Sequence, residues 1–135
     1  MANKPKDYQV FFGCSDFSGL FRGRAVSSTL YKSKLNTGCG WVPADQALTP
    51  FGEIGTSNPF GSLGDLRLIP DQKAEYSIKC DEMISPLHFF LCDITNLDGS
   101  PWTCCARNYL KKGIKLLKER YGLSLKIGFE HEFTL

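Results

Sequence analysis

The sequence lacks any long apolar run of the kind that crosses a membrane. No stretch approaches the roughly 18 consecutive apolar residues that a membrane-spanning helix needs. The first residues, Met-Ala-Asn-Lys-Pro-Lys, are polar and contain neither the apolar core nor the cleavage site of a signal peptide. We therefore expect a cytoplasmic protein with no membrane partner.

An excess of charge of one sign is also missing. The chain has 135 residues with 16 Lys and Arg against 14 Asp and Glu, a net charge of +2. This balance gives no broad electrostatic reason to expect nucleic acid as a partner. The hydrophobic content of 42%, with 10 Phe, is too high for a disordered chain and is enough for one folded core.

Recognisable cysteine motifs are absent although the chain has six cysteines. There is no Cys-x-x-Cys pair, and neither histidine stands at a zinc-finger distance from the thiols. Without a secretory context, free thiols are favoured over disulfides. Cys14 and Cys92 lie in apolar runs, where a reduced cysteine packs as a small hydrophobe. The adjacent Cys104 and Cys105 leave a redox-active pair open as an alternative.

Several short strands and one long helix are predicted. Aromatic and β-branched content or alternation predicts strands over residues 8–14, 20–26, 66–69, 75–80 and 87–94. The first two form a hairpin, and a short helix follows them up to about Leu35. Pro70 is expected to stop the third strand. Strands with one long helix packed across them predict a single, small α+β domain.

The long helix is predicted over residues 106–121. Apolar residues recur at three- and four-residue spacing on one side, at Leu110, Ile114, Leu117 and Tyr121. Lysines and an arginine occupy most of the other side, and Gly122 is a natural terminator. A solvated face explains these cations better than a basic binding patch. The helix and the segment after it are also candidates for the start of a further domain.

A long segment rich in glycine and proline, residues 36–64, separates the hairpin from the next strand. Its turn residues are too dense for a long helix. Trp41, Phe51 and Phe60 argue against complete disorder, because aromatic side chains gain by burial. We interpret the segment as a large surface loop with local anchors.

The last segment, residues 125–134, alternates apolar and polar residues and predicts a strand. Glu130 and Glu132 fall on the same face of that strand, with their carboxylates a few ångströms apart. Hard divalent cations such as Mg²⁺ or Mn²⁺ prefer oxygen ligands of this kind. The alternative is an ordinary solvated acidic edge, and the two residues taken alone favour this alternative.

Four segments in order resemble the glutamine synthetase family. Residues 16–26 resemble its opening hairpin, and residues 64–71 resemble its aspartate-hydrophobic-Pro-Asp signature. Residues 92–107 resemble the approach to its first long helix. Residues 128–133, Gly-Phe-Glu-His-Glu-Phe, are similar to its Gly-x-Glu-x-Glu-Phe strand. Each motif is weak singly, but together they span nearly the whole chain.

The resemblance implies a β-grasp N-terminal domain over residues 1–104, with residues 105–135 as the first helix and strand of a truncated catalytic domain. Members of this family use ATP to phosphorylate glutamate, and an amine or ammonia then displaces the phosphate. In the family pattern the two glutamates bind different divalent cations, which assigns Glu130 and Glu132 to Mg²⁺ or Mn²⁺. With only these ligands, the chain is expected to be inactive alone.

The family also implies ring oligomers in which one N-terminal domain closes the active site of its neighbour. Residues 48–61 are the candidate closing loop, with Glu53 and Ser57 as candidate substrate contacts. This loop reads Phe-Gly-Glu-Ile-Gly-Thr-Ser at 51–57, whereas the namesake enzymes carry an Asp-Gly-Ser-Ser stretch that helps bind ammonium. A larger amine is therefore a candidate substrate. The alternative function is a non-catalytic β-grasp module that serves as a binding surface.

Overall fold

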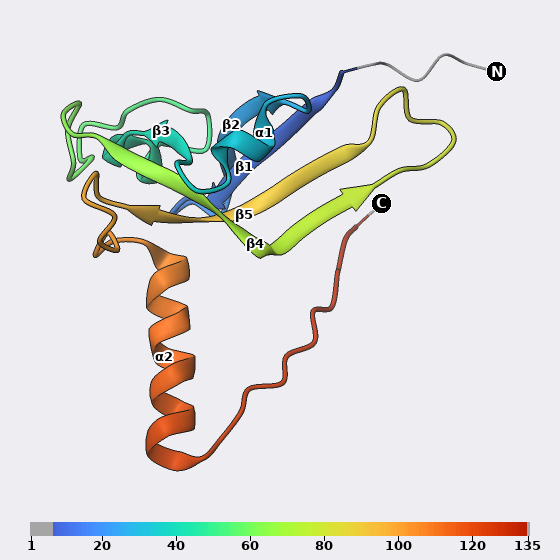
Figure 1. Ribbon diagram of the computed structural model, residues 1–135. Coiled ribbons are helices and arrows are strands. Elements are labelled where there is room, and N and C mark those ends of the chain that lie inside the picture. The colour runs from blue at the N-terminus through green and yellow to red at the C-terminus, as the bar shows by residue number, and fades with distance from the viewer. Residues whose placement is uncertain (1–6, 135) are drawn as a thin grey trace.

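The two N-terminal strands form the predicted hairpin. In the computed structural model, which describes residues 7–134, β1 (Gln9–Ser15) pairs antiparallel with β2 (Phe21–Ser27) (Figure 1). The carboxylate of Asp16 closes the turn by accepting hydrogen bonds from the backbone N–H groups of Ser18 at 2.9 Å and Leu20 at 2.8 Å. Gly19 has a φ of 81°, a conformation that glycine adopts without a steric penalty.

A five-stranded mixed sheet forms the body of the molecule. Its strands lie in the order β2-β1-β5-β4-β3, where β1 and β5 are parallel and the other pairs are antiparallel. The remaining elements are α1 (Tyr31–Lys34), β3 (Cys39–Trp41), the short 3₁₀ helix η1 (Pro43–Gln46), β4 (Leu66–Ile78), β5 (Leu87–Thr95) and α2 (Ala106–Tyr121). This is a β-grasp-like α+β fold, as expected from the sequence.

The hydrophobic core lies on one face of the sheet. Alternate residues of the strands supply it, because successive side chains of a strand point to opposite faces. Its largest fully buried apolar side chains are Phe12, Phe90, Leu68 and Ile94. The rings of Phe12 and Phe90 meet edge to face with centroids 5.5 Å apart. Partly buried apolar side chains, among them Tyr31, Leu35 and Trp102, pack against this core.

One long strand replaces two predicted short ones. The sequence predicts strands at 66–69 and 75–80 with a stop at Pro70, but β4 runs through both, with an irregular register between Pro70 and Glu75. Proline cannot donate a ladder hydrogen bond, and a bulge at such a position lets the strand continue past it. The predicted stop at Pro70 is therefore wrong.

The segment 36–64 has more structure than a surface loop. It contains β3, which pairs with β4, and η1. Trp41 is buried in β3, so the predicted aromatic anchor is a strand residue of the core. The interpretation as a loop throughout is wrong for residues 39–46 and holds for the residues that follow η1.

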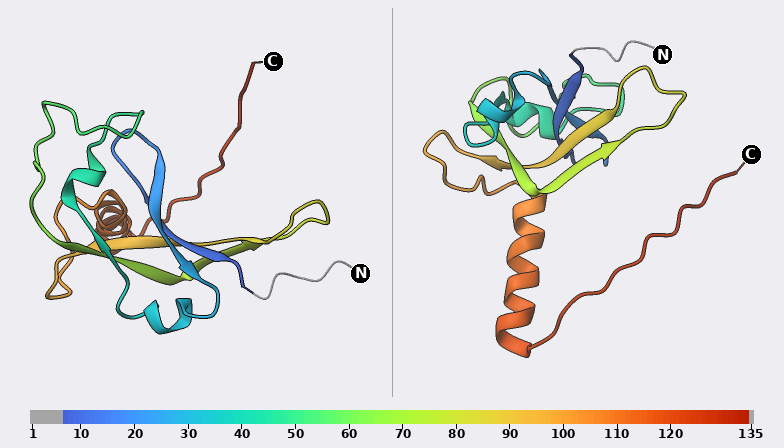
Figure 2. Two further views of the ribbon diagram at one scale, coloured as in Figure 1. Left: turned by 90° about the horizontal axis from the view of Figure 1, so that it is seen from above. Right: turned by 45° about the vertical axis from the view of Figure 1, so that its right-hand side comes forward.

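Helix α2 has the predicted bounds, and Gly122 ends it with a φ of 66°. Its expected position is wrong, however, because α2 does not pack across the sheet. It projects away from the sheet, so that it is seen almost end-on from above (Figures 1 and 2). None of its residues is buried. Within residues 7–134 no helix is long and apolar enough to cross a membrane.

The segment after α2 forms no strand in the structure. Residues 122–134 have no assigned secondary structure and lead away from the end of the helix (Figure 1). A strand is stabilised by hydrogen bonds to a neighbouring strand. The alternating pattern of this segment therefore predicts which side chains share a face, but the described part of the chain offers no partner strand for it.

Candidate functional site

The loop between η1 and β4 carries two of the predicted site residues, Glu53 and Ser57. Leu48 and Ile54 form an isolated antiparallel bridge, which turns the chain back on itself. Thr49 stabilises this turn, since its Oγ1 accepts a hydrogen bond from the N–H of Glu53 at 3.1 Å. Both Glu53 and Ser57 are exposed on this loop.

Polar contacts anchor the base of the loop to the domain. The side-chain amide of Asn58 donates to the carbonyl oxygens of Ala44 at 3.2 Å and Ala47 at 3.0 Å. Arg22, which also pairs with Asp16, donates to the carbonyl oxygen of Thr49 at 3.0 Å. These bonds tie the base of the loop to η1 and β2.

Aromatic contacts also hold the base of the loop, whereas the side chains at the tip of the loop are exposed. The ring of Phe60 lies 5.2 Å from that of Trp102 and 6.2 Å from that of Phe17, centroid to centroid. By contrast, Phe51 at the tip is 92% exposed, and Ile54 is exposed beside it. An ordered loop that presents apolar side chains around a carboxylate is suited to contact another protein surface.

The predicted metal ligands Glu130 and Glu132 lie in the exposed segment after α2. Carboxylates are appropriate ligands for Mg²⁺ or Mn²⁺. Among residues 7–134, however, no three His, Cys, Asp or Glu side chains come together as a metal site. These two residues do not form a complete site within the described chain, and their assignment as metal ligands stays a prediction.

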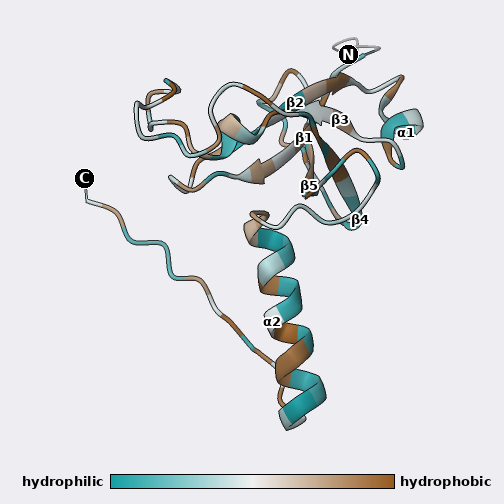
Figure 3. Ribbon diagram, turned by 90° about the vertical axis from the view of Figure 1, so that its left-hand side faces the viewer, coloured by the Kyte–Doolittle hydropathy of each residue, from teal (hydrophilic) through white to brown (hydrophobic). Residues whose placement is uncertain are grey.

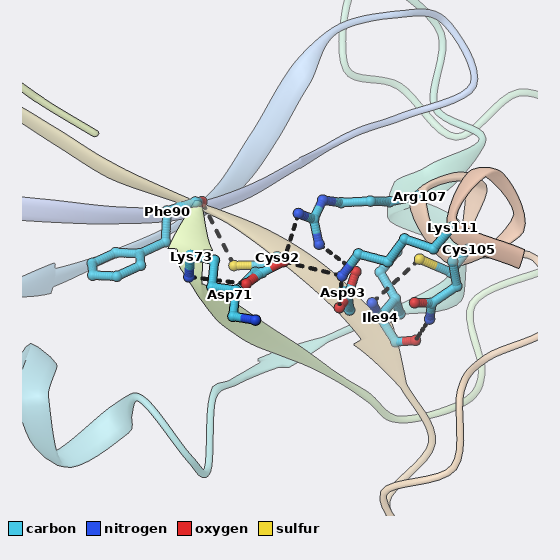
Figure 4. A network of polar contacts seen from close by, with 10 residues as sticks. Asp71, Lys73, Phe90, Cys92, Asp93, Ile94, Cys105, Arg107 and Lys111 are labelled. Carbon is cyan, nitrogen blue, oxygen red and sulfur yellow. Dashed lines mark hydrogen bonds and ion pairs between the residues drawn. The ribbon is translucent and has the colours of Figure 1, made fainter. Parts of the chain in front are cut away.

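A cluster of four charged side chains joins α2 to the sheet (Figure 4). Arg107 donates to Asp93 at 2.6 Å and to Asp71 at 2.7 Å. Lys111, one turn further along α2, donates to Asp93 at 2.6 Å and to Asp71 at 3.1 Å. Each carboxylate is thus held by both cations.

This ion cluster shifts the titration of one carboxyl. The hydrogen bond from Arg107 holds the pKa of Asp71 well below its usual range, against the effect of partial burial, and Lys111 adds to the lowering. A partial signal for the cluster is present in the sequence, since Arg107 and Lys111 share a helix face at i and i+4. Asp71 and Asp93 come from β4 and β5, so no local sequence pattern places them together.

His88 and three of the cysteines are buried in the domain. His88, which the sequence placed in an apolar strand, is 5% exposed, with Nε2 2.8 Å from Glu75 Oε1 and Nδ1 3.3 Å from the Tyr8 hydroxyl. All six cysteines are free thiols. Burial raises the pKa of the Cys14 thiol to about 11, so this thiol is unreactive at neutral pH. Cys105 is buried and Cys104 is exposed, which separates the environments of the adjacent pair.

The sequence and the fold match those of known proteins. Residues 5–102 match the family of glutamine synthetase N-terminal domains. Because this match covers most of the chain, the protein belongs to the glutamine synthetase family. The recognition from four ordered sequence segments is thereby confirmed.

Two relatives are longer proteins. The chain is 28% identical over 134 residues to a glutamate–isopropylamine ligase of a Pseudomonas species, covering 93% of the chain and 28% of that protein. It is 45% identical over 77 residues to type-1 glutamine synthetase 1 of Dictyostelium discoideum, covering 55% of the chain and 15% of that protein. The chain therefore matches a minor part of the length of each relative.

Solved structures support the same fold. A crystal structure of a novel glutamine synthase homolog superposes with a TM-score of 0.79 at 32% identity, covering 88% of the chain and 28% of the homolog. A cryoEM structure of Plasmodium falciparum glutamine synthetase superposes with a TM-score of 0.60 at 20% identity, covering 82% of the chain and 19% of that protein. At this lower identity, the second match supports the fold alone.

Proposed function

We propose that this chain is the N-terminal part of an ATP-dependent glutamate–amine ligase and is inactive by itself. The observation that carries the proposal is the similarity over 93% of the chain to a protein named as a glutamate–isopropylamine ligase. In the longer parent protein, glutamate and an amine or ammonia are the substrates, ATP is the phosphoryl donor, and the location is cytoplasmic.

The loop over residues 48–61 contributes to an active site shared between subunits. Its base is anchored by Asn58 and Phe60, and its tip presents Phe51 and Glu53 to solvent. A rigid loop with an exposed apolar tip can close a neighbouring site with little loss of conformational entropy. Apolar Phe51 and Ile54 favour an amine with an alkyl group over ammonia, because burying that group gains the hydrophobic free energy of transfer.

The segment after α2 supplies two ligands to the divalent cations. Glu130 and Glu132 would hold Mg²⁺ or Mn²⁺ together with groups from the rest of the parent protein, in a ring oligomer of identical subunits. A bound cation supplies charge neutralisation at the phosphoryl group when present. The same segment needs a partner strand for its alternating pattern, so the predicted strand and the metal site would form together.

ADP release by the full-length parent tests this function, with glutamate, ATP and a panel of amines that includes ammonia and isopropylamine. We expect release to depend on one class of amine. Glu132→Ala should lower it by more than about a hundredfold, since a metal contact of several kcal/mol is removed. Glu119→Gln, an exposed carboxylate on α2, is the matched control and should change the rate less than about twofold.

Two further variants test the loop. Glu53→Gln and Ser57→Ala should alter the KM for the amine more than the KM for ATP.

If the folded parent protein releases no ADP with any amine, the ligase assignment is wrong and the non-catalytic binding module takes its place. If ADP release is amine-dependent but unaffected by the loop variants, the ligase stands and the role of the loop is wrong.

A further inference from the structure

Three basic side chains from separate elements line one hollow beside the edge strand of the sheet. Arg24 comes from β2, Lys34 from the end of α1 and Arg67 from β4, and the hollow has a volume of about 530 Å³. Asp65 is the only acidic residue that lines it within the described part of the chain. The local excess of positive charge contrasts with the nearly balanced charge of the chain as a whole.

The cations of this hollow are largely free to bind a ligand. Within residues 7–134, Lys34 and Arg67 form no salt bridge, and Arg24 has only a long one to Asp45, at 3.8 Å. The guanidinium of Arg24 lies 5.6 Å from the centre of the buried Trp41 ring. This cation–π contact holds the guanidinium in place without neutralising its charge.

The backbone of β3 is accessible to a ligand in this hollow. β3 is an edge strand, paired only with β4 in the described sheet. Gly40, in the middle of β3, lines the hollow, and a Cβ built there would meet no atom within 4 Å. A ligand can therefore approach the strand closely at Gly40.

A second hollow of about 480 Å³ shares Lys34, Gly38 and Arg67 with the first. Asn36 and Thr37 line it, together with Thr95. The hydroxyl oxygen of Thr95 is buried and has no hydrogen-bond partner in the described structure. Lys34 and Arg67 thus line both the cationic hollow and the polar hollow.

We propose that these two hollows form a binding site for a small multivalent phosphate compound. Three cations that line one hollow from separate elements can contact several oxygens of a phosphoryl group, and arginine binds phosphate with two parallel hydrogen bonds. The phosphoryl group binds Arg24, Lys34 and Arg67, and the rest of the ligand occupies the polar hollow. This site does not depend on the proposed ligase function.

Calorimetric titration of the 135-residue chain with pyrophosphate tests the site. The paired substitution Lys34→Gln with Arg67→Gln should weaken binding by about tenfold or more, because two charge-assisted contacts are lost. Both side chains are exposed, so the fold should persist, which circular dichroism checks. The matched control, Lys112→Gln with Lys118→Gln, removes the same charge from α2 and should weaken binding less than about twofold.

Two single variants separate a specific site from general charge. Asp65→Asn removes the opposing carboxylate and should tighten binding by about two- to threefold. Gly40→Leu adds bulk at a position where a Cβ meets no atom within 4 Å, and it should weaken binding with the net charge unchanged. The proposal is overturned if pyrophosphate does not bind, if the α2 control weakens binding as much as the paired variant, or if citrate binds as tightly as pyrophosphate.

Discussion

The sheet and helix α2 both have an apolar face, but only that of the sheet is covered. Phe12, Leu68 and Phe90 of the strands are buried almost completely, whereas Leu110 and Ile114 of α2 are exposed. Figure 3 shows apolar stretches on α2 that stand clear of the sheet. The difference teaches that the first part of the chain contains its own core, while the described residues leave the apolar face of α2 exposed.

The largest expected effect is in the core of the sheet. Phe90→Ala should lower the free energy of unfolding by about 3–5 kcal/mol, because the side chain is 1% exposed and its removal leaves a cavity against Phe12. Tyr109→Ala removes an aromatic ring that is 78% exposed on α2 and should cost less than about 0.5 kcal/mol. Urea unfolding followed by circular dichroism measures both. Equal costs would contradict the distinction between the two regions.

A smaller effect is expected at the junction of the two regions. Asp71→Asn should lower the free energy of unfolding by about 1 kcal/mol at pH 7, since the carboxylate is partly exposed and its ion pairs are screened. The pKa of Asp71 is lowered in the folded chain. Its contribution is therefore fully present above its unfolded pKa of about 4 and is lost as the pH falls below that value.

Urea unfolding between pH 7 and pH 2 measures this contribution. The difference between wild type and Asp71→Asn should shrink steadily below about pH 4. Asp81→Asn, at an exposed carboxylate in the turn between β4 and β5, is the control and should leave the profile unchanged. A difference that is constant down to pH 2 would mean that the ion cluster does not stabilise the junction.

The same comparison explains what the sequence predicts and what it does not. The period of the apolar residues predicts β1, β2, β5 and α2, because local geometry sets which side chains share a face. It does not predict that β4 continues past Pro70, since pairing with β5 and a bulge keep that strand intact. It also does not predict that α2 projects away from the sheet, because an apolar stripe identifies a helix face and not the surface, if any, that covers it.

The candidate functional residues also fall into those that the sequence predicts and those that it does not. The sequence predicts Glu130 and Glu132 through their resemblance to a family motif, and Glu53 and Ser57 through the position of their loop. These assignments stay predictions. It does not reveal the Asp71–Asp93–Arg107–Lys111 cluster or the hollow at Arg24, Lys34 and Arg67, because each joins residues from separate elements. Such sites depend on the sheet order and on the direction in which α2 leaves it.

The smallest change in the free energy of unfolding is expected for a substitution on the exposed apolar face of α2. The change should be larger in the proposed full-length ligase. Ile114, 39% exposed, lies on this face. Ile114→Ala should change the free energy of unfolding of the 135-residue chain by less than about 0.5 kcal/mol, because the side chain is outside the core and alanine favours the helix. In the proposed full-length ligase, where further residues would cover this face, the cost should rise to about 2–5 kcal/mol.

Unfolding of both proteins measures the change, with Lys112→Ala on the polar side of α2 as the control. The control should have the same small effect in both, because a solvated lysine gains no partner when the apolar face is covered. A large cost of Ile114→Ala in the short chain would mean that α2 already packs on a surface there. A small cost in both would mean that its apolar face stays exposed in the parent, and the second region would then need no partner.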